Sequence, residues 1–115
     1  MEIEHARELL ARERDRVERS LAALAAGDGE GEELADVDQH LGDAGTETFE
    51  RERDEGLAER LRSELAAIER AERRLADGSY GRSVESGEPI PDARLEAIPW
   101  AERTVEEQAR HDRGA

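Results

Sequence analysis

The sequence predicts an all-α protein, in which a long antiparallel coiled-coil helical hairpin carries a small C-terminal knob. Two segments, 2–26 and 46–77, repeat apolar residues at helical spacing, and a polar, glycine-rich stretch separates them. All three prolines lie further on, between 89 and 99. Of the 115 residues, 42% are charged and 36% are hydrophobic. This composition excludes a thick globular core and favours exposed helices that share a thin apolar seam.

The first helix is expected over residues 2–26. Its apolar stripe recurs every three, four or seven residues and consists of Ile3, Ala6, Leu10, Val17, Leu21 and Leu24. Glycines at 27, 29 and 31 then interrupt the pattern. A helix with one such stripe cannot bury it alone, so we expect a partner helix.

The second helix is expected over residues 46–77, with Thr46 as its N-cap and Gly78 as the residue that ends it. Its stripe consists of Phe49, Leu57, Leu61, Leu65, Ile68 and Leu75. Pairing the two stripes in antiparallel orientation buries both of them, which makes residues 1–77 a coiled-coil hairpin.

The connection at residues 27–45 forms the tip of the predicted hairpin. It is long for a helical hairpin, whose loops usually have about two to eight residues. Residues 27–50 contain nine acidic residues and no basic one, out of a net charge of −14 for the whole chain. A salt-adapted protein would spread its acidity over the surface, whereas here the excess charge belongs to one end of the hairpin.

The C-terminal knob, residues 78–115, is expected to be rich in turns. We predict an irregular stretch up to Pro91, a short helix over 92–97 and a C-terminal helix over 100–110. A small core is expected from Tyr80, Ile90, Leu95, Ile98, Trp100 and Val105. A core of this size is marginal without further support.

Charge and composition exclude several classes of function. An excess of acidic residues argues against direct DNA binding through phosphates and against docking on an anionic membrane. No cysteine is present, so disulfides, thiolate metal sites and thiol redox chemistry are excluded. No apolar run is long enough for a membrane span and no signal peptide is evident, so we expect a cytoplasmic protein. No catalytic constellation, phosphate loop or cofactor motif occurs, so we expect neither an enzyme nor a cofactor.

The knob resembles the C-terminal zinc finger of the DksA/TraR family over residues 80–108, YGRSVESGEPIPDARLEAIPWAERTVEEQ. The family pattern is roughly G-x-C-x-x-C-G, then I-x-x-x-R-L-E-A-x-P, then C-x-x-C. The matching positions are Gly81, Gly87, Ile90, Arg94, Leu95, Glu96, Ala97 and Pro99. Residues 38–57, DQHLGDAGTETFERERDEGL, are similar to the family's hairpin tip and the start of its second helix. With the two long helices, the resemblance covers nearly the whole chain.

The knob departs from the family at the four positions of the zinc-binding cysteines, which hold Ser83, Ser86, Thr104 and Glu107. Their spacing, with two, seventeen and two residues between them, is that of a four-cysteine zinc site. Hydroxyls and one carboxylate do not replace the thiolates that hold structural zinc. We therefore expect a zinc-less finger that keeps its shape by packing and by Ser and Thr hydrogen bonds to the backbone. A hard-metal site that uses Glu107 is the alternative.

The resemblance implies a bacterial regulator of transcription. Members of the family bind RNA polymerase rather than DNA, insert the hairpin into the secondary channel and bring acidic tip residues near the catalytic Mg²⁺. Their tip motif is approximately D-x-x-D-x-A. Asp43 matches its second aspartate, His40 stands where the first would be, and Asp38 is the nearest replacement carboxylate. The resemblance implies that these three residues face the polymerase active centre, and it leaves a guanosine alarmone at that interface open.

Two functions from other classes stay open at this point. The chain could be an acidic coiled-coil adaptor or dimerisation module that no longer binds polymerase. It could also use the acidic loop to buffer metal ions or to mimic nucleic acid. Binding to core RNA polymerase separates the regulator from the adaptor, and uptake of divalent ions by the isolated protein would indicate the third function.

Overall fold

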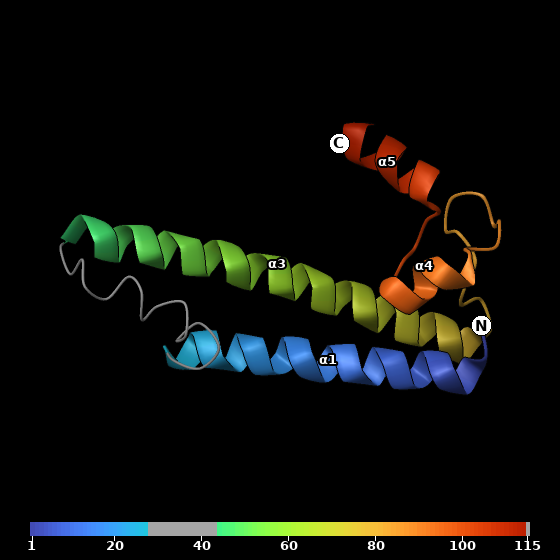
Figure 1. Ribbon diagram of the computed structural model, residues 1–115, viewed down its shortest axis with the longest axis horizontal. Helices are drawn as coiled ribbons and strands as arrows, with labels where there is room; N and C mark the ends of the chain where they lie inside the picture. The colour runs from blue at the N-terminus through green and yellow to red at the C-terminus, as the bar shows by residue number, and fades with distance from the viewer. Residues whose placement is uncertain (28–43, 115) are drawn as a thin grey trace. The chain divides into compact units, whose positions relative to one another are not determined.

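The computed structural model describes residues 1–27 and 44–114, and this part of the chain is helical (Figure 1). In chain order the elements are α1 (Ile3–Ala26), α3 (Ala44–Asp77), α4 (Asp92–Ala97) and α5 (Val105–Gly114). The described residues contain no β-strand, only an isolated antiparallel bridge between Arg82 and Pro89. The all-α prediction is therefore confirmed. α3 begins two residues before the expected cap at Thr46, at Ala44, a strong helix former.

The chain divides into two compact units, and each contains a piece of both long helices. The first unit comprises Met1–Glu13 and Ala66–Ala115, so the start of α1 belongs with the end of α3 and with the knob. The second unit is Arg14–Leu65, which joins the end of α1 to the first part of α3. This grouping is the one that an antiparallel hairpin requires, and Figure 1 shows α1 and α3 side by side.

Each unit buries apolar residues from both helices. In the first unit, the buried side chains of the hairpin are Ala6 and Leu10 from α1 and Ala67, Ile68 and Ala71 from α3. In the second unit, Val17 of α1 and Leu61 of α3 are buried, and Arg16 forms an ion pair with Glu64. Most of the predicted stripes therefore point inward.

Ile3 and Phe49 are exceptions, because 44% and 69% of their surfaces are exposed. Both were expected in the inward stripes of the two helices, and these two predictions are wrong. Phe49 lies eight residues before Leu57, and eight residues turn a helix by about 80° beyond two full turns. Its side chain therefore leaves the apolar seam and faces outward from α3.

The chain leaves α3 through a glycine turn at the position predicted. Gly78 has a φ of +85°, a left-handed conformation that favours glycine. The backbone N–H groups of Ser79 and Tyr80 both donate to the carbonyl of Arg74, at 3.0 and 3.2 Å. These bonds satisfy a carbonyl that the helix end would leave without a partner.

The knob has a small apolar core built on Ile90, Leu95 and Ala101, with Met1, Tyr80 and Ile98 packed against it. Tyr80 donates its hydroxyl to the carbonyl of Pro99 at 2.8 Å, and burial raises the pKa of this phenol to about 12. Two expected members are not in this core. Val105 is 60% exposed at the first turn of α5, and Trp100 lines a surface groove with Ala67 and His111.

None of the helices in the described part of the chain combines the length and the apolar character that a membrane crossing needs.

Candidate functional site

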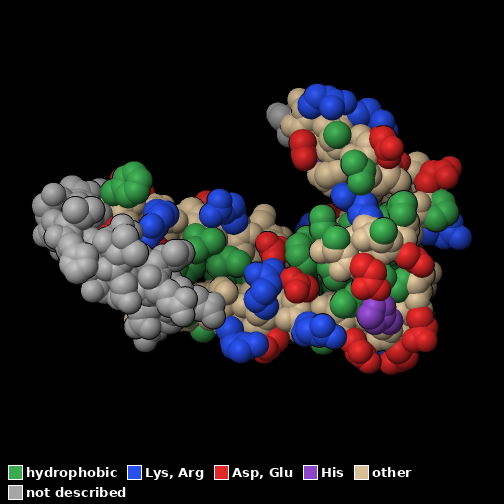
Figure 2. Space-filling view, viewed as in Figure 1, with side chains coloured by type: hydrophobic (Ala, Val, Ile, Leu, Met, Phe, Trp, Pro, Cys, Tyr) green, Lys and Arg blue, Asp and Glu red, His purple; other side chains and the backbone are tan. Residues whose placement is uncertain are grey.

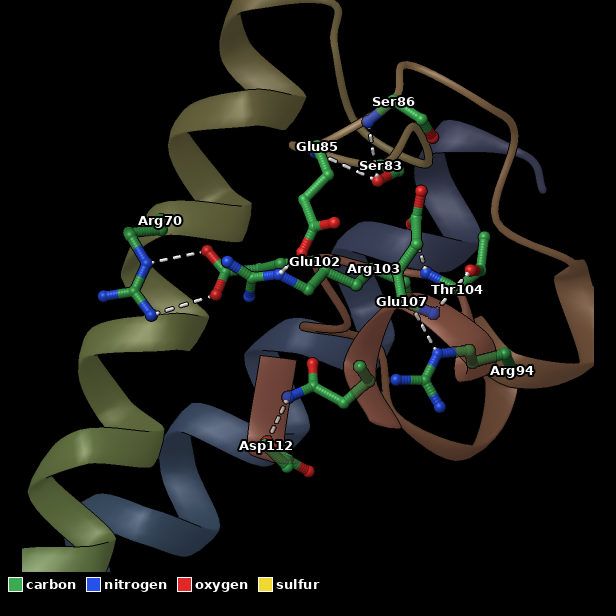
Figure 3. Close-up of polar contacts among 11 residues, drawn as sticks. Arg70, Ser83, Glu85, Ser86, Arg94, Glu102, Arg103, Thr104, Glu107 and Asp112 are labelled. Carbon is green, nitrogen blue, oxygen red and sulfur yellow. Dashed lines mark hydrogen bonds and ion pairs between the residues drawn. The ribbon is translucent and has the colours of Figure 1, made fainter. Parts of the chain in front are cut away.

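The four residues at the expected zinc positions lie together in the knob (Figure 3). Ser83 and Ser86 belong to the loop that follows Gly81, and Thr104 and Glu107 flank the start of α5. We call these four residues the polar quartet. Ser83 and Glu107 are the two buried polar residues among those described, at 5% and 6% exposure.

The two serines of the quartet organise their loop through backbone hydrogen bonds. The hydroxyl of Ser83 accepts from the N–H groups of Glu85 and Ser86, at 3.0 and 3.3 Å. The hydroxyl of Ser86 accepts from the N–H of Glu88 at 3.2 Å. Such side-chain bonds close a tight turn, because they replace backbone bonds that a short loop cannot make.

Thr104 and Glu107 form a capping box at the N-terminus of α5. The carboxylate of Glu107 accepts from the N–H of Thr104 at 2.9 Å, and the hydroxyl of Thr104 accepts from the N–H of Glu107 at 3.2 Å. Two N–H groups at the helix start are satisfied reciprocally in this motif. The motif explains why α5 begins at Val105 rather than at the predicted Trp100.

Glu107 links the two halves of the quartet. Hydrogen bonds from the hydroxyls of Ser83 and Ser86 and from the backbone N–H of Thr104 lower the pKa of Glu107 to about 2. The carboxylate is therefore ionised at neutral pH, and several donors compensate its burial. A polar hub of this kind holds the serine loop against the start of α5.

A second polar cluster joins the knob to α3 (Figure 3). Glu102 accepts two hydrogen bonds from Arg70, at 2.7 and 3.1 Å, and one from Arg74 at 3.3 Å. The Arg70 hydrogen bond is the main reason why the pKa of Glu102 is lowered. In the described part of the chain, Nη2 of Arg74 is a buried side-chain nitrogen without a hydrogen-bond partner. Arg74 therefore depends on Glu102 for its charge compensation.

The RLEA segment at 94–97 serves the knob in several ways. Leu95 is a core residue with 2% exposure, and Nε of Arg94 donates to the carbonyl of Arg103 at 2.8 Å. The carboxylate of Glu96 lies 2.6 Å from Nε2 of His5 on α1. Through these contacts α4 is connected to Arg103, which precedes α5, and to the N-terminal helix α1.

The three predicted tip residues, Asp38, His40 and Asp43, lie outside the described residues, as does most of the expected tip loop at 27–45. The structure therefore brings the quartet together, and the roles of the three tip residues stay a prediction. Sequence reasoning named all four quartet residues but missed the cluster around Glu102. A capping-box signal, Thr104-x-x-Glu107, was present in the sequence and marks the start of α5.

A family model described as the prokaryotic DksA/TraR C4-type zinc finger matches residues 78–113, which are the knob. Two curated relatives match over longer segments. General stress protein 16O of Bacillus subtilis is 42% identical over 73 residues, 64% of this chain and 45% of that protein. RNA polymerase-binding transcription factor DksA of Caulobacter vibrioides is 53% identical over 55 residues, 48% of this chain and 39% of that protein. The matches thus span less than half the length of either relative.

A solved structure matches almost the whole chain. The structure of transcription factor DksA2 from Pseudomonas aeruginosa superposes with a TM-score of 0.73 at 29% sequence identity. The match covers 96% of this chain and 83% of that one. The similarity therefore extends from the knob to the helical hairpin.

The residues of this knob do not fit the zinc ion that a C4-type finger holds. The chain has no cysteine, and the quartet offers three hydroxyls and one carboxylate, which suit zinc poorly. All four side chains are also engaged in hydrogen bonds with one another or with the backbone. Among the described residues, no group of three or more His, Cys, Asp or Glu side chains could hold a metal ion.

Proposed function

Because the chain belongs to the DksA/TraR C4 zinc-finger family, we propose that it regulates transcription by binding RNA polymerase through the secondary channel, without zinc. Two of the similar proteins, DksA of Caulobacter vibrioides and DksA2 of Pseudomonas aeruginosa, are named as transcription factors. The observation that carries the proposal is the match to DksA2, which covers hairpin and knob together. A relative with 53% identity over 55 residues is named for its binding to RNA polymerase.

The polar quartet supports the part of the proposal that concerns zinc. Ser83 and Ser86 sit on the loop side, and Thr104 and Glu107 on the α5 side, as two pairs of cysteines would in a C4 finger. Glu107 accepts hydrogen bonds from both sides. A network of hydrogen bonds therefore connects the same two segments that a metal ion connects in a zinc finger.

The charge distribution supports the proposed orientation of the hairpin. Nine acidic residues and no basic one lie between 27 and 50. A polymerase secondary channel admits nucleotides toward a catalytic Mg²⁺, and a cationic, metal-containing channel attracts an acidic probe. We propose that Asp38, His40 and Asp43 act there, with Asp43 as the carboxylate closest in role to the family's tip aspartate.

The proposal is tested by capture of the full chain on immobilised core RNA polymerase at low salt. We expect saturable binding. Asp43→Asn should change transcription output in a reconstituted reaction far more than it changes affinity, because its proposed role is at the active centre. Asp15→Asn, on α1, is the matched control and should change neither. Absence of binding by a folded chain would overturn the proposal and favour the adaptor.

A further inference from the structure

Apolar packing is incomplete where the knob meets the end of α3, residues 66–77 of the first unit. The small core of the knob consists of Ile90, Leu95 and Ala101 with three further residues packed on it, and none of these six described residues belongs to α3. A groove of about 410 Å³ lies at the junction, lined by Ala67 of α3 and by Trp100 of the knob. The orientation of the knob on α3 therefore depends on polar contacts as well.

Glu102 supplies such a contact from the knob (Figure 3). Its carboxylate accepts hydrogen bonds from Arg70 at 2.7 and 3.1 Å and from Arg74 at 3.3 Å. The two arginines are four residues apart on α3, so their like charges repel unless a carboxylate compensates them. The side chains of Glu102 and Arg74 are 16% and 14% exposed, so water compensates little if this contact is lost.

The residues around Glu102 connect this contact to the rest of the knob. The carbonyl of Glu102 accepts from the N–H of Val84 at 2.9 Å. Nε of Arg103 donates to the carboxylate of Glu85 at 2.6 Å, and the carbonyl of Arg103 accepts from Nε of Arg94 at 2.8 Å. Residues 102 and 103 thus join the end of α3 to the serine loop and to α4, immediately before α5 begins.

We propose that Glu102 is a positioning residue, which holds the knob on the end of α3 so that the two meet RNA polymerase as one rigid surface. This inference rests on the proposed function and adds to it a requirement on the geometry of the knob. The face of the knob in Figure 2 mixes acidic, basic and apolar side chains. Recognition of a mixed surface depends on the arrangement of its groups more than on its net charge.

A fixed orientation strengthens binding to a partner that contacts both elements. The orientation is then set before binding, and little conformational freedom is lost when the complex forms. Without the carboxylate of Glu102, Arg70 and Arg74 would face the knob as two uncompensated cations. The knob would then adopt several orientations on α3, and binding to polymerase would have to restore one of them.

The test compares Glu102→Gln with the unchanged full chain, well below the melting temperature of both. The affinity for immobilised core RNA polymerase should fall about tenfold. The second measurement is the fluorescence of Trp100, the single tryptophan of the chain, which lines the groove at the junction. We expect its emission to move to longer wavelength and its quenching by acrylamide to increase, because the knob moves away from α3. A role in stability alone would change neither quantity while the chain stays folded.

Glu85→Gln is the matched control, because it removes the same charge from a carboxylate that binds Arg103 within the knob. Its affinity should change less than about threefold, and the emission of Trp100 should stay the same. Arg70→Ala is a second variant, for the case that Glu102→Gln does not fold. It should weaken binding by a smaller factor and shift the emission in the same direction. Adding it to Glu102→Gln should have little further effect, because both changes act on one contact.

Two outcomes would overturn the inference and leave the proposed function standing. Weaker binding of Glu102→Gln without a change in the fluorescence of Trp100 would mean that Glu102 contacts the polymerase directly. A change in the fluorescence with unaltered binding would mean that the orientation of the knob does not matter for the complex. Absence of binding by the unchanged chain would instead overturn the proposed function, and the inference with it.

Discussion

Thr104 and Glu107 exchange two hydrogen bonds across the first turn of α5, at 2.9 and 3.2 Å. The carboxylate of Glu107 also accepts hydrogen bonds from the hydroxyls of Ser83 and Ser86. One glutamate thus caps a helix and fastens a loop. In a C4 finger these two tasks fall to a metal ion and its four thiolates. Here they are done by hydrogen bonds that need neither zinc nor a reducing environment.

Thr104→Ala should destabilise the knob by about 1 kcal/mol, the usual cost of losing a threonine N-cap. The N–H of Glu107 would lose its hydroxyl acceptor, and α5 would fray from its start. Thermal unfolding followed by circular dichroism gives the change. Glu106→Gln, at an exposed neighbour in the same turn, is the control and should stay close to the unchanged chain. Equal melting temperatures for Thr104→Ala and the control would contradict the capping role.

The stability of the knob should depend on pH through Glu107. Its pKa is lowered from 4.5 to about 2 in the folded state, so the unfolded chain binds the proton more tightly than the folded one. The stabilisation is therefore complete above about pH 4.5 and is lost as the pH falls from there toward 2. Glu107→Gln removes this contribution.

Many other carboxylates titrate in the same range, so the measured quantity is the difference between Glu107→Gln and the unchanged chain. The gap in free energy of unfolding should narrow steadily as the pH falls from 5 to 2. Glu106→Gln serves as the control, because Glu106 is the exposed neighbour of Glu107 in the same turn. A gap that is constant with pH would show that Glu107 acts by shape rather than by charge.

Zinc should not change the thermal stability of the natural chain, and a variant with four cysteines should regain zinc binding. We expect no stoichiometric zinc in the purified protein and an unchanged melting curve in the presence of a chelator. The fourfold variant Ser83→Cys, Ser86→Cys, Thr104→Cys and Glu107→Cys has the spacing of a C4 site on two segments that already lie together.

This fourfold variant should bind one zinc ion per chain and melt at a higher temperature with zinc than without it. Titration with cobalt is an independent measurement, because cobalt bound by four thiolates in tetrahedral geometry has a characteristic absorption spectrum. A variant with only Ser83→Cys and Ser86→Cys is the control and should bind zinc far more weakly. Failure of the fourfold variant to bind zinc would mean that the two segments no longer hold the finger's geometry.

Several features of this fold could be predicted because the signals are local. Helical spacing of apolar residues predicts α1 and α3, and Gly78 marks the end of α3. The pattern Thr104-x-x-Glu107 lies within four residues and encodes a capping box, although its spacing equally suits a pair of former metal ligands. Phe49 was misplaced because it lies about 80° around the helix from Leu57 and about 120° from the buried Leu61.

Other features could not be predicted because they join distant parts of the chain. Arg70 and Glu102 are 32 residues apart and meet only when the knob folds back on α3. Charged residues are so frequent here that no single pair stands out in the sequence. The burial of Arg74, and hence its dependence on Glu102, follows from packing that a sequence pattern does not express.

In the cluster around Glu102, removing Glu102 should cost more folding stability than removing Arg70. Glu102→Ala leaves the side chain of Arg74, which is 14% exposed, without its acceptor, in addition to the unpaired Nη2 that it already has. We expect a loss of about 2 kcal/mol, because a largely buried cation loses its partner. Arg70→Ala removes a side chain that is 45% exposed and leaves Glu102 bonded to Arg74. Its cost should stay below about 1 kcal/mol. Chemical denaturation of both single variants and the double variant measures the coupling, and a larger loss for Arg70→Ala would show that the exposed arginine, not the buried one, sets the requirement for Glu102.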